Sequence, residues 1–352
     1  MTTTAAAPAV LLRPTRLGPG RVAGAVVLLF AAVTAGVLVG AADLGAGRVL
    51  GEVVAQLTGG LSPLSEREAA ILWQIRVPRV VLGALVGAAL AGSGAAFQSV
   101  FRNPLADPYL LGAAAGAGLG ATLVVAAAPA VTGWVIGPLP LAAFAGALLG
   151  VAMAWALGRS AGSGPASLVL AGVAVTAFLT AVQTFVAQRN TESLREVYSF
   201  ILGSLGAAGW REVLVALPYV VLAAVVLTVG ARLLDVLAVG DEEAAALGIR
   251  PGRVRLVVVV AASLATAAAV SVSGLIGFVG IVVPHLVRLL LAGSYRVVLP
   301  LSLLGGAAFL VLADILARTV LSPAELPIGV VTAFTGAPFF ALVLRRSRGG
   351  AW

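Results

Sequence analysis

The 352-residue sequence contains no cysteine, no lysine and a single histidine, His285. Without cysteine there is no disulfide framework, no thiol nucleophile and no iron–sulfur ligation. One histidine excludes an ordinary zinc cluster. A Walker A loop needs a lysine for the nucleotide phosphates, so the chain does not hydrolyse ATP by that route. We therefore expect no metal site, no cofactor and no catalytic residue.

Charge is scarce as well, because only 10% of the residues are charged while 61% are hydrophobic and the mean hydropathy is +1.10. Apolar stretches of about 20 residues, the length that crosses a bilayer, recur along the chain. The 43 glycines and the many alanines suit helices packed through small residues. We predict an all-α polytopic membrane protein with about ten transmembrane helices, at about 22–42, 77–100, 109–128, 135–158, 168–188, 213–234, 254–272, 275–292, 297–317 and 326–344.

The basic residues, all 22 of them arginine, predict the orientation of these spans. An even number of spans puts both termini on one side, and a cytoplasmic N-terminus leaves only eight arginines outside, as the positive-inside rule prefers. The arginines thus fall in membrane loops, and the formal charge of +8 indicates no nucleic-acid partner. We predict a disordered cytoplasmic lead at residues 1–20 and one membrane domain at 21–348. The first apolar run is longer than the core of a signal peptide, so we expect it to be retained.

The middles of the ten spans contain almost no ionisable residue. Acids inside the membrane are the usual means by which a transporter couples to protons or sodium. Their absence argues against a secondary transporter and a proton pump. It permits a passive channel, or a permease powered from outside the membrane.

A polar segment at 240–249 interrupts this apolar pattern. Asp241, Glu242 and Glu243, followed by alanines through Ala246, predict a short helix with acids in its first turn, where the helix dipole favours them. Gly248 is expected to end that helix. Such a helix between two spans is suited to bind a partner protein at the membrane surface, with Leu247 as its apolar anchor. A solvated turn between two spans is the alternative.

Arg76 and Arg79 open the second span at the outer face, against the positive-inside trend. Anchoring to lipid phosphates would explain them, and so would pairing with acids of an external partner. At the outer end of the ninth span, Asp314 and Arg318 stand four residues apart and can pair along one helix face. Glu325 lies near the start of the tenth span.

Two cytoplasmic loops are rigid in sequence. Pro104 and Pro108 force an extended turn after the second span, and Asn103 and Asp107 can cap the adjoining helix ends. The loop at 161–167 is small and proline-kinked. A structural role as turns is enough to account for both loops. The alternative is that the same rigidity forms a constriction at the cytoplasmic mouth.

The stretch at 273–285 carries three glycines and a proline through a span, which permits bent helices and close backbone approach. His285 ends this stretch. We expect it to be a hydrogen-bonded structural residue near the cytoplasmic end and not a ligand.

Taken together, these segments resemble the FecCD family of ABC-transporter permeases, which import iron–siderophores, haem and cobalamin. The match follows the family's order over nearly the whole chain, from about residue 22 to 344. The matching stretches are Arg76-Val-Pro-Arg79, Gly87-Ala-Ala-Leu-Ala-Gly-Ser-Gly-Ala-Ala-Phe-Gln98, Asn103-Pro-Leu-Ala106, Leu168-Val-Leu-Ala-Gly172, Ala245-Ala-Leu-Gly248, Gly277-Phe-Val-Gly-Ile-Val-Val-Pro-His-Leu-Val-Arg288, Leu312-Ala-Asp-Ile-Leu-Ala-Arg318 and Glu325-Leu-Pro-Ile-Gly329.

The resemblance implies a cobalamin-permease-like bundle of ten helices in the bacterial plasma membrane. Its implied partners are a second permease subunit, identical or not, a separate pair of ATPase subunits, an external substrate-binding protein and membrane lipid. By resemblance, 240–249 is the coupling helix that seats in the ATPase. The outer residues Arg76, Arg79 and Arg318 align with arginines that in cobalamin permeases pair with acids on the binding protein.

The resemblance also implies two cytoplasmic gates. Asn103 and Pro104 lie in the matching first gate loop. Pro165 and Ala166 stand at the second gate, where cobalamin permeases carry small hydroxyl residues. We therefore expect the permease subunit of an ATP-driven importer for an iron chelate, a siderophore first, with haem or cobalamin as the alternative cargo. A passive channel is the alternative from another class.

Overall fold

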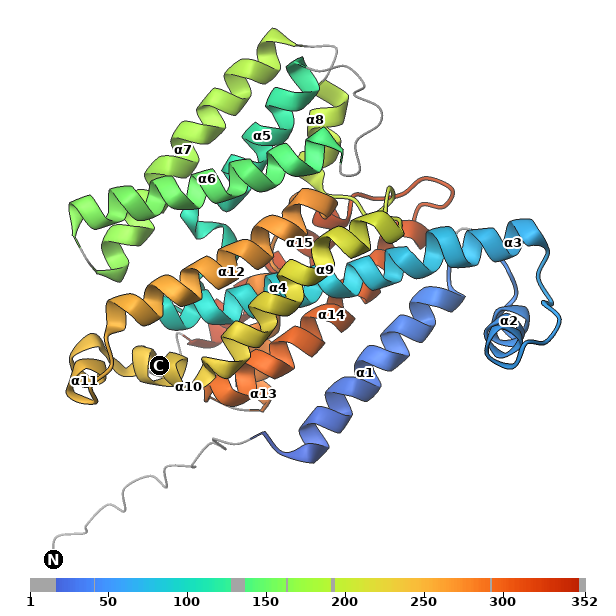
Figure 1. The fold of residues 1–352 in the computed structure, drawn as a ribbon, viewed down its shortest axis with the longest axis horizontal. Coiled ribbons are helices and arrows are strands. Elements are labelled where there is room, and N and C mark those ends of the chain that lie inside the picture. The colour runs from blue at the N-terminus through green and yellow to red at the C-terminus, as the bar shows by residue number, and fades with distance from the viewer. Residues whose placement is uncertain are drawn as a thin grey trace, which may run out of the picture.

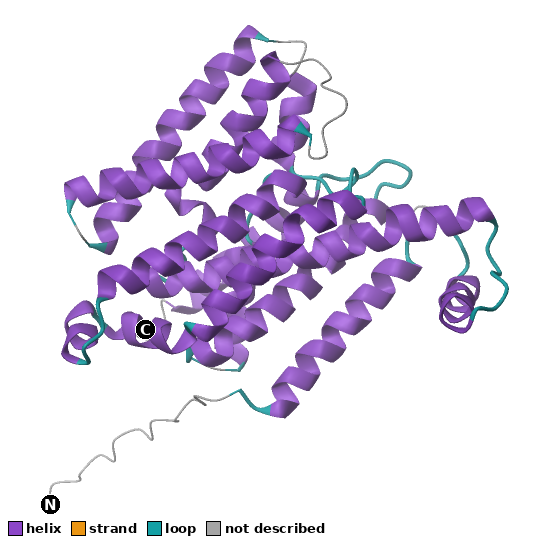
Figure 2. Cartoon of the chain, viewed as in Figure 1, coloured by secondary structure: helices purple, strands orange, loops and turns teal. Residues whose placement is uncertain are grey.

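The computed structural model describes residues 17–40, 42–127, 137–162, 164–190, 194–291 and 293–347, and within these ranges it is built from helices and loops without a strand (Figure 2). The helices are α1 (Pro19–Leu38), α2 (Ala46–Thr58), α3 (Glu66–Ala70), the π-helix η1 (Ile71–Arg76), α4 (Val77–Val100), the 3₁₀-helix η2 (Pro108–Leu111), α5 (Ala113–Ala127), α6 (Pro138–Ala161), α7 (Pro165–Arg189), α8 (Leu194–Leu202), α9 (Trp210–Val229), α10 (Ala231–Val239), α11 (Asp241–Ala246), α12 (Pro251–Ser273), α13 (Val279–Leu290), α14 (Tyr295–Thr319) and α15 (Ile328–Ser347).

The predicted polytopic helical fold is confirmed. Seven helices in the described ranges are long and apolar enough to cross a membrane, and one of them runs unbroken for 35 residues from Glu66 to Val100. Three shorter apolar helices, α5, α13 and α15, complete the set. The ten apolar stretches of the sequence fall on these ten helices one for one. The predicted lead differs at its end, because residues 19 and 20 already belong to α1, while residues 1–16 lie outside the described residues.

The eighth span starts later than the apolar run that predicted it. The sequence pattern put its beginning at residue 275, but α13 begins at Val279. Gly274 and Phe278 both have a φ of 68°, in the left-handed region, so the chain leaves α12 and enters α13 through a non-helical link. The hydroxyl of Tyr109 satisfies both backbone polar groups of Ile276 in this link. It accepts from the Ile276 N–H at 3.0 Å and donates to the Ile276 carbonyl at 3.1 Å.

The centre of the bundle is α4, which is buried along nearly its whole length and lies among α9, α12, α13 and α14 (Figure 1). Glycines allow its neighbours to approach at backbone distance. A Cβ placed on Gly87 would lie 2.1 Å from the carbonyl oxygen of Gly306 in α14. One on Gly94 would lie 2.0 Å from the carbonyl oxygen of Gly280 in α13. The expectation that small residues bring these helices together is confirmed at both crossings.

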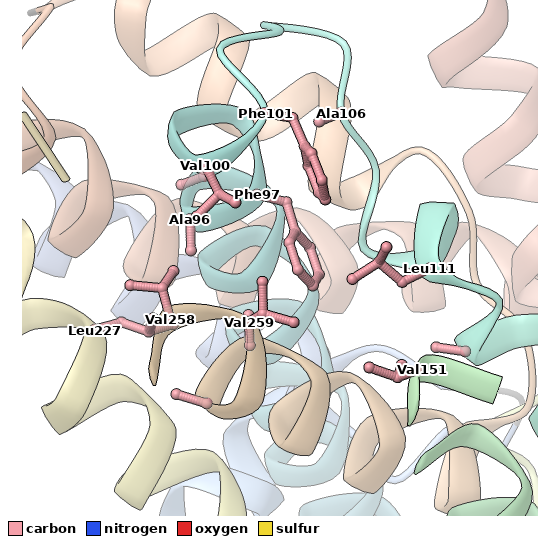
Figure 3. Packing of buried hydrophobic residues seen from close by; sticks show 14 of the residues in the cluster. Ala96, Phe97, Val100, Phe101, Ala106, Leu111, Val151, Leu227, Val258 and Val259 are labelled. Carbon is pink, nitrogen blue, oxygen red and sulfur yellow. The ribbon is translucent and has the colours of Figure 1, made fainter. Parts of the chain in front are cut away.

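Helices α5, α6 and α7 form a three-helix group on one side of the bundle (Figure 1). The same kind of contact holds it together, because a Cβ on Gly116 of α5 would lie 2.0 Å from the carbonyl oxygen of Gly146 in α6. Apolar side chains fill the space between this group and the centre. The rings of Phe97 and Phe101 stack with centroids 5.8 Å apart. Figure 3 shows Phe97 next to Val259 and Phe101 next to Ala106, and Val151, Leu227 and Val258 belong to the same apolar cluster.

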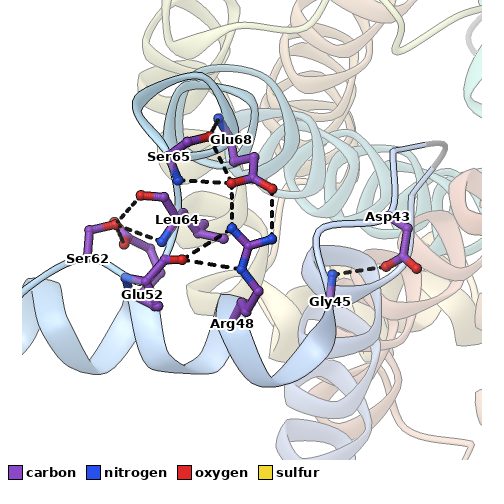
Figure 4. Close-up of polar contacts among 9 residues, drawn as sticks. Asp43, Gly45, Arg48, Glu52, Ser62, Leu64, Ser65 and Glu68 are labelled. Carbon is purple, nitrogen blue, oxygen red and sulfur yellow. Dashed lines mark hydrogen bonds and ion pairs between the residues drawn. The ribbon is translucent and has the colours of Figure 1, made fainter.

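The short helices lie at the two ends of the spans. One end carries α10 and α11, and the opposite end carries α2, α3 and α8 (Figure 1). The segment between α1 and the start of α4 is folded by polar contacts (Figure 4). Arg48 donates to both carboxylate oxygens of Glu68, with Nη1 to Oε1 at 2.8 Å, and Glu68 forms a capping box with Ser65 at the start of α3. Helix α8 is amphipathic, and Val197 is its buried residue.

Replacing Gly87 with alanine should disturb the crossing of α4 and α14. The added methyl group would overlap the Gly306 carbonyl, and overpacking of this kind costs about 1–3 kcal/mol or more. Gly24→Ala in α1 is the matched control, because no atom lies within 4 Å of its Cβ position. The control should be neutral or slightly stabilising, by about 0.4–1 kcal/mol. Thermal unfolding of both purified variants in detergent measures the difference, and equal melting temperatures would contradict the close contact.

Candidate functional site

The polar segment at 240–249 folds as the sequence predicts. Helix α11 has Asp241, Glu242 and Glu243 in its first turn. Gly248 ends it with a φ of 76°, and its N–H donates to the carbonyl of Ala245 at 2.9 Å. The Ile249 N–H donates to the carbonyl of Ala244 at 3.0 Å, which completes a Schellman motif. The segment is therefore a capped helix and not a solvated turn.

The surface of α11 has an anchored side and an open side. Ala244 is fully buried against the rest of the protein. Leu247 is 70% exposed, and the side chains of Glu242, Glu243 and Ala246 are exposed as well. An exposed leucine with two exposed acids on the same short helix has the composition of a small docking surface, with an apolar centre and a polar rim. Its assignment to the ATPase stays a prediction.

Asp241 does more than favour the helix start. Its carboxylate accepts from Arg255 of α12 at 2.9 Å and from Arg102, just past the end of α4, at 3.2 Å. Arg102 has a φ of 48°, an uncommon conformation for a residue with a side chain. The sequence pattern found Asp241 as a first-turn acid but not its partners, which lie 14 and 139 residues away. Through Asp241, α11 is joined to the beginning of the proline-rich loop.

That loop, at 102–108, is held by side-chain bonds at both ends. The Asn103 side chain accepts from the Leu105 N–H at 2.9 Å, and the Asp107 side chain accepts from the Tyr109 N–H at 2.8 Å. Asp107 therefore caps η2, as the sequence predicts, whereas Asn103 closes a turn within the loop. The exposed Asn103 and the half-buried Pro104 are the predicted first-gate residues, and their role as a gate stays a prediction.

Gln98 is the residue that sequence reasoning missed. Its carboxamide nitrogen donates to the carbonyl of Ala106 at 3.3 Å and to that of Gly280 at 3.0 Å, and its oxygen accepts from Arg288. One side chain thus connects α4, the 102–108 loop and α13. The sequence signal for Gln98 is an isolated amide side chain near the end of an apolar span. The three residues on either side of it, 95–97 and 99–101, are small, apolar or hydroxylated.

The second predicted gate lies across a cleft from α11. Pro165 is the first residue of α7, a position that proline favours, and Ala166 next to it is exposed. Gly162 and Leu168, on either side of these two, line the same cleft as Ala245 of α11. The structure therefore brings Gly162, Leu168 and α11 to one end of the bundle.

At the opposite end, the predicted docking arginines are buried and already paired. Arg79 donates to Asp314 at 2.8 Å and to Glu325 at 2.8 Å. Arg318 pairs with Asp314 at 3.5 Å, four residues away as predicted, and donates to the Gly36 carbonyl at 2.7 Å. Arg76 donates to backbone carbonyls of the last two residues of α1 and to that of Ala42 beyond it, the last at 2.6 Å.

These contacts change how the three arginines can act. Arg76, Arg79 and Arg318 are each at most 8% exposed, so their guanidinium groups brace α1, α4, α14 and the segment before α15. Glu325 is the accessible member of the cluster, with 39% of its side chain exposed, and hydrogen bonds from Arg79 hold the pKa of its carboxyl below the usual range. Pairing with acids of an external protein stays a prediction, and it requires such acids to compete with Glu325.

His285 differs from its prediction. Its side chain is 7% exposed, and neither ring nitrogen has a hydrogen-bond partner in the part of the chain that the structure describes. The ring packs edge-on against Phe339 of α15, with centroids 6.0 Å apart. His285 lies in the middle of α13 and acts there as a packing residue. No group of three or more histidine, aspartate and glutamate side chains within the described residues is placed to hold a metal ion.

Comparison with known proteins gives a consistent set of similarities. Residues 27–346 match the model of the FecCD transport family. The chain is 45% identical over 281 residues to the cobalamin import system permease protein BtuC of Halobacterium salinarum, covering 80% of this chain and 74% of that protein. It is 40% identical over 283 residues to a probable iron chelatin transport system permease protein of Helicobacter pylori, covering 79% and 83%.

A solved structure shares the fold over nearly the whole chain. It is an inward-facing conformation assigned to the metal-chelate type of ABC transporter, with a TM-score of 0.80 and 26% sequence identity. The likeness covers 94% of this chain and 100% of that one.

Removing the charge of Arg79 should destabilise the bundle strongly. Arg79→Gln leaves the buried Asp314 carboxylate with only the longer contact to Arg318, and breaking a buried pair costs about 3–5 kcal/mol. Arg48→Gln is the matched control, because it removes an equally bidentate but exposed pair with Glu68, and surface pairs contribute little. Thermal unfolding in detergent compares the two. A small effect at Arg79 would show that the buried cluster is not a brace.

Asp107 should make stability depend on pH. Burial raises the pKa of this carboxyl to about 6, whereas an unfolded aspartate titrates near pH 4. Between about pH 4 and 6 the unfolded chain loses the proton first, so the native protein loses stability as the pH rises, by at most about 2–3 kcal/mol. Asp107→Asn keeps an oxygen for the Tyr109 N–H, and it should remove this decline and be more stable than the wild type at pH 7.5.

The measurement is thermal unfolding in detergent from pH 4 to 7.5. Asp43→Asn is the matched control, since Asp43 is exposed and also accepts a backbone N–H two residues on, that of Gly45 (Figure 4). Identical pH profiles for the wild type and Asp107→Asn would contradict the assignment.

Proposed function

The chain belongs to the FecCD transport family, and on this premise we propose that it is the permease subunit of an ATP-binding-cassette importer that carries an iron chelate, specifically a siderophore, into the cytoplasm. Ten apolar helices supply a membrane passage, and a chain without lysine has no Walker A loop. The energy must then come from a separate ATPase. The observation that carries the proposal is α11, a capped helix with an exposed leucine at the end of an otherwise basic membrane bundle.

The geometry of α11 supports its role as the coupling helix. Leu247 would fill an apolar groove of the ATPase, with Glu242 and Glu243 at the rim. A movement of α11 would be transmitted to Arg102 through the ion pair with Asp241. Arg102 begins the loop that contains Asn103 and Pro104. We propose that this loop, together with the region of Pro165 and Ala166, closes the cytoplasmic mouth. The ion pair thus offers a direct physical connection from ATPase to gate.

The remaining partners follow from the same family membership. We propose a second permease subunit beside this one, in the plasma membrane with both termini in the cytoplasm, and an external binding protein at the opposite face. At that face the partly exposed Glu325 is paired with the buried Arg79, and Arg76 and Arg318 are buried as well. A carboxylate of the binding protein would dock by replacing Glu325 on Arg79, an exchange of one acid for another.

Cobalamin is the second candidate cargo, because a relative of 45% identity is a cobalamin permease. The siderophore and the cobalamin proposals differ in the substrate that is transported. Uptake of a ferric siderophore or of cobalamin into proteoliposomes distinguishes them. A passive channel would need no ATPase. Co-purification of an ATPase subunit with this chain would therefore exclude the channel, and uptake without ATP would favour it.

Leu247→Arg tests the coupling helix. Losing a central apolar anchor typically costs about 2 kcal/mol or more of binding, roughly a thirtyfold loss of affinity, so ATPase co-purification and ATP-driven uptake should both fall sharply. The fold should survive, because Leu247 is 70% exposed. Glu242→Gln on the same helix is the control and should have a small effect, as rim charges usually do. Normal uptake by Leu247→Arg would refute the coupling assignment.

A further inference from the structure

A cleft of about 610 Å³ opens at the α11 end of the bundle, between the ends of α6 and α7 on one side and the α11–α12 connection on the other. In Figure 1 this is the place where α11 faces the three-helix group. Nothing in the proposed coupling or gating uses the interior of this cleft, so its lining has to be explained separately.

The rim of the cleft is strongly basic. Four arginines line it: Arg159 at the end of α6, Arg250 before α12, and Arg253 and Arg255 in the first turns of α12. Arg255 is engaged by Asp241. Arg159, Arg250 and Arg253 are exposed and have no carboxylate partner within the described ranges. Three uncompensated positive charges around one cleft favour an anionic ligand, and guanidinium groups match phosphate in a bidentate manner.

The wall of the cleft is apolar and belongs to the membrane spans. Trp155 lies one turn before Arg159 in α6, and Leu256 lies three residues after Arg253 in α12. Leu168 of α7 also lines the cleft. Both α6 and α12 are membrane-spanning by length and composition. The cleft is therefore amphipathic along the spans, with cationic groups at the span ends and apolar side chains further inside.

We propose that this cleft binds an anionic phospholipid from the adjacent leaflet. The headgroup phosphate would lie among Arg159, Arg250 and Arg253, and an acyl chain would lie along Trp155 and Leu256. Basic pockets between transmembrane helices are known sites for acidic headgroups. A free inorganic anion would satisfy the arginines but would leave the apolar wall uncovered, so the lining fits an amphiphile better.

The proposed site and the proposed ATPase contact occupy different faces of α11. Ala245 and Ile249 line the cleft, whereas the exposed Leu247 and Glu242 do not. An ATPase seated on Leu247 therefore leaves the cleft accessible to lipid. A bound lipid would contact both the 162–168 region and α11, and would bridge them. The site requires only that the chain spans a membrane and does not depend on the cargo.

Native mass spectrometry of the purified full-length chain, titrated with phosphatidylglycerol or with phosphatidylcholine of the same acyl chains, tests the site. The wild type should retain phosphatidylglycerol at least tenfold better. Arg250→Gln combined with Arg253→Gln should abolish that preference. Arg232→Gln combined with Arg345→Gln is the matched control, since both residues are exposed at the same end of the bundle but do not line the cleft. The control should behave as the wild type.

A photoreactive phosphatidylglycerol on the wild-type chain provides a second measurement that needs no variant. Crosslinks should map to peptides containing residues 155–168 and 245–256. Equal retention of the two lipids, an unchanged preference in the cleft variant, or crosslinks confined to other helices would overturn the proposal. Displacement of phosphatidylglycerol by equimolar inorganic phosphate would also overturn it, because the site would then select a small anion.

Discussion

Everything in this bundle depends on backbone-to-backbone approach around α4. Lipid tails are as apolar as the helices, so a bilayer does not press apolar helices together, and close van der Waals contact must replace the hydrophobic effect. Gly87 meets Gly306 and Gly94 meets Gly280 with no room for a methyl group. These two crossings set which helices are neighbours of α4, and therefore which polar groups can meet at its two ends.

The polar contacts at the two ends of α4 have different roles. At one end, Arg79 pairs with Asp314 and Glu325 and so connects helices from distant parts of the chain. At the other, Gln98 and Arg102 connect the loop after α4 to α13 and to α11. In the first set Arg79 and Asp314 are buried and only Glu325 is accessible. In the second set Gln98 is buried, whereas the pair of Arg102 and Asp241 is partly exposed.

The features that sequence analysis predicted correctly are all local. Ten spans follow from the length of apolar runs, the start and stop of α11 from acids and a glycine within eight residues, and the pair of Asp314 and Arg318 from a spacing of four. The features it missed join distant parts of the chain. Arg79 and Asp314 are 235 residues apart, and Arg102 and Asp241 are 139 apart, so no spacing rule connects them.

Composition and spacing alone thus determined that the chain crosses a membrane about ten times, and that α11 is a capped acidic helix beside it. Only the tertiary structure decided which charges are available. It buried the three predicted docking arginines against carboxylates or backbone carbonyls, left His285 without a hydrogen-bond partner among the described residues, and left Arg159, Arg250 and Arg253 around an open cleft. The reason is physical: a local pattern reports the length and faces of one helix, whereas the partner of a charged side chain depends on which helices pack against each other.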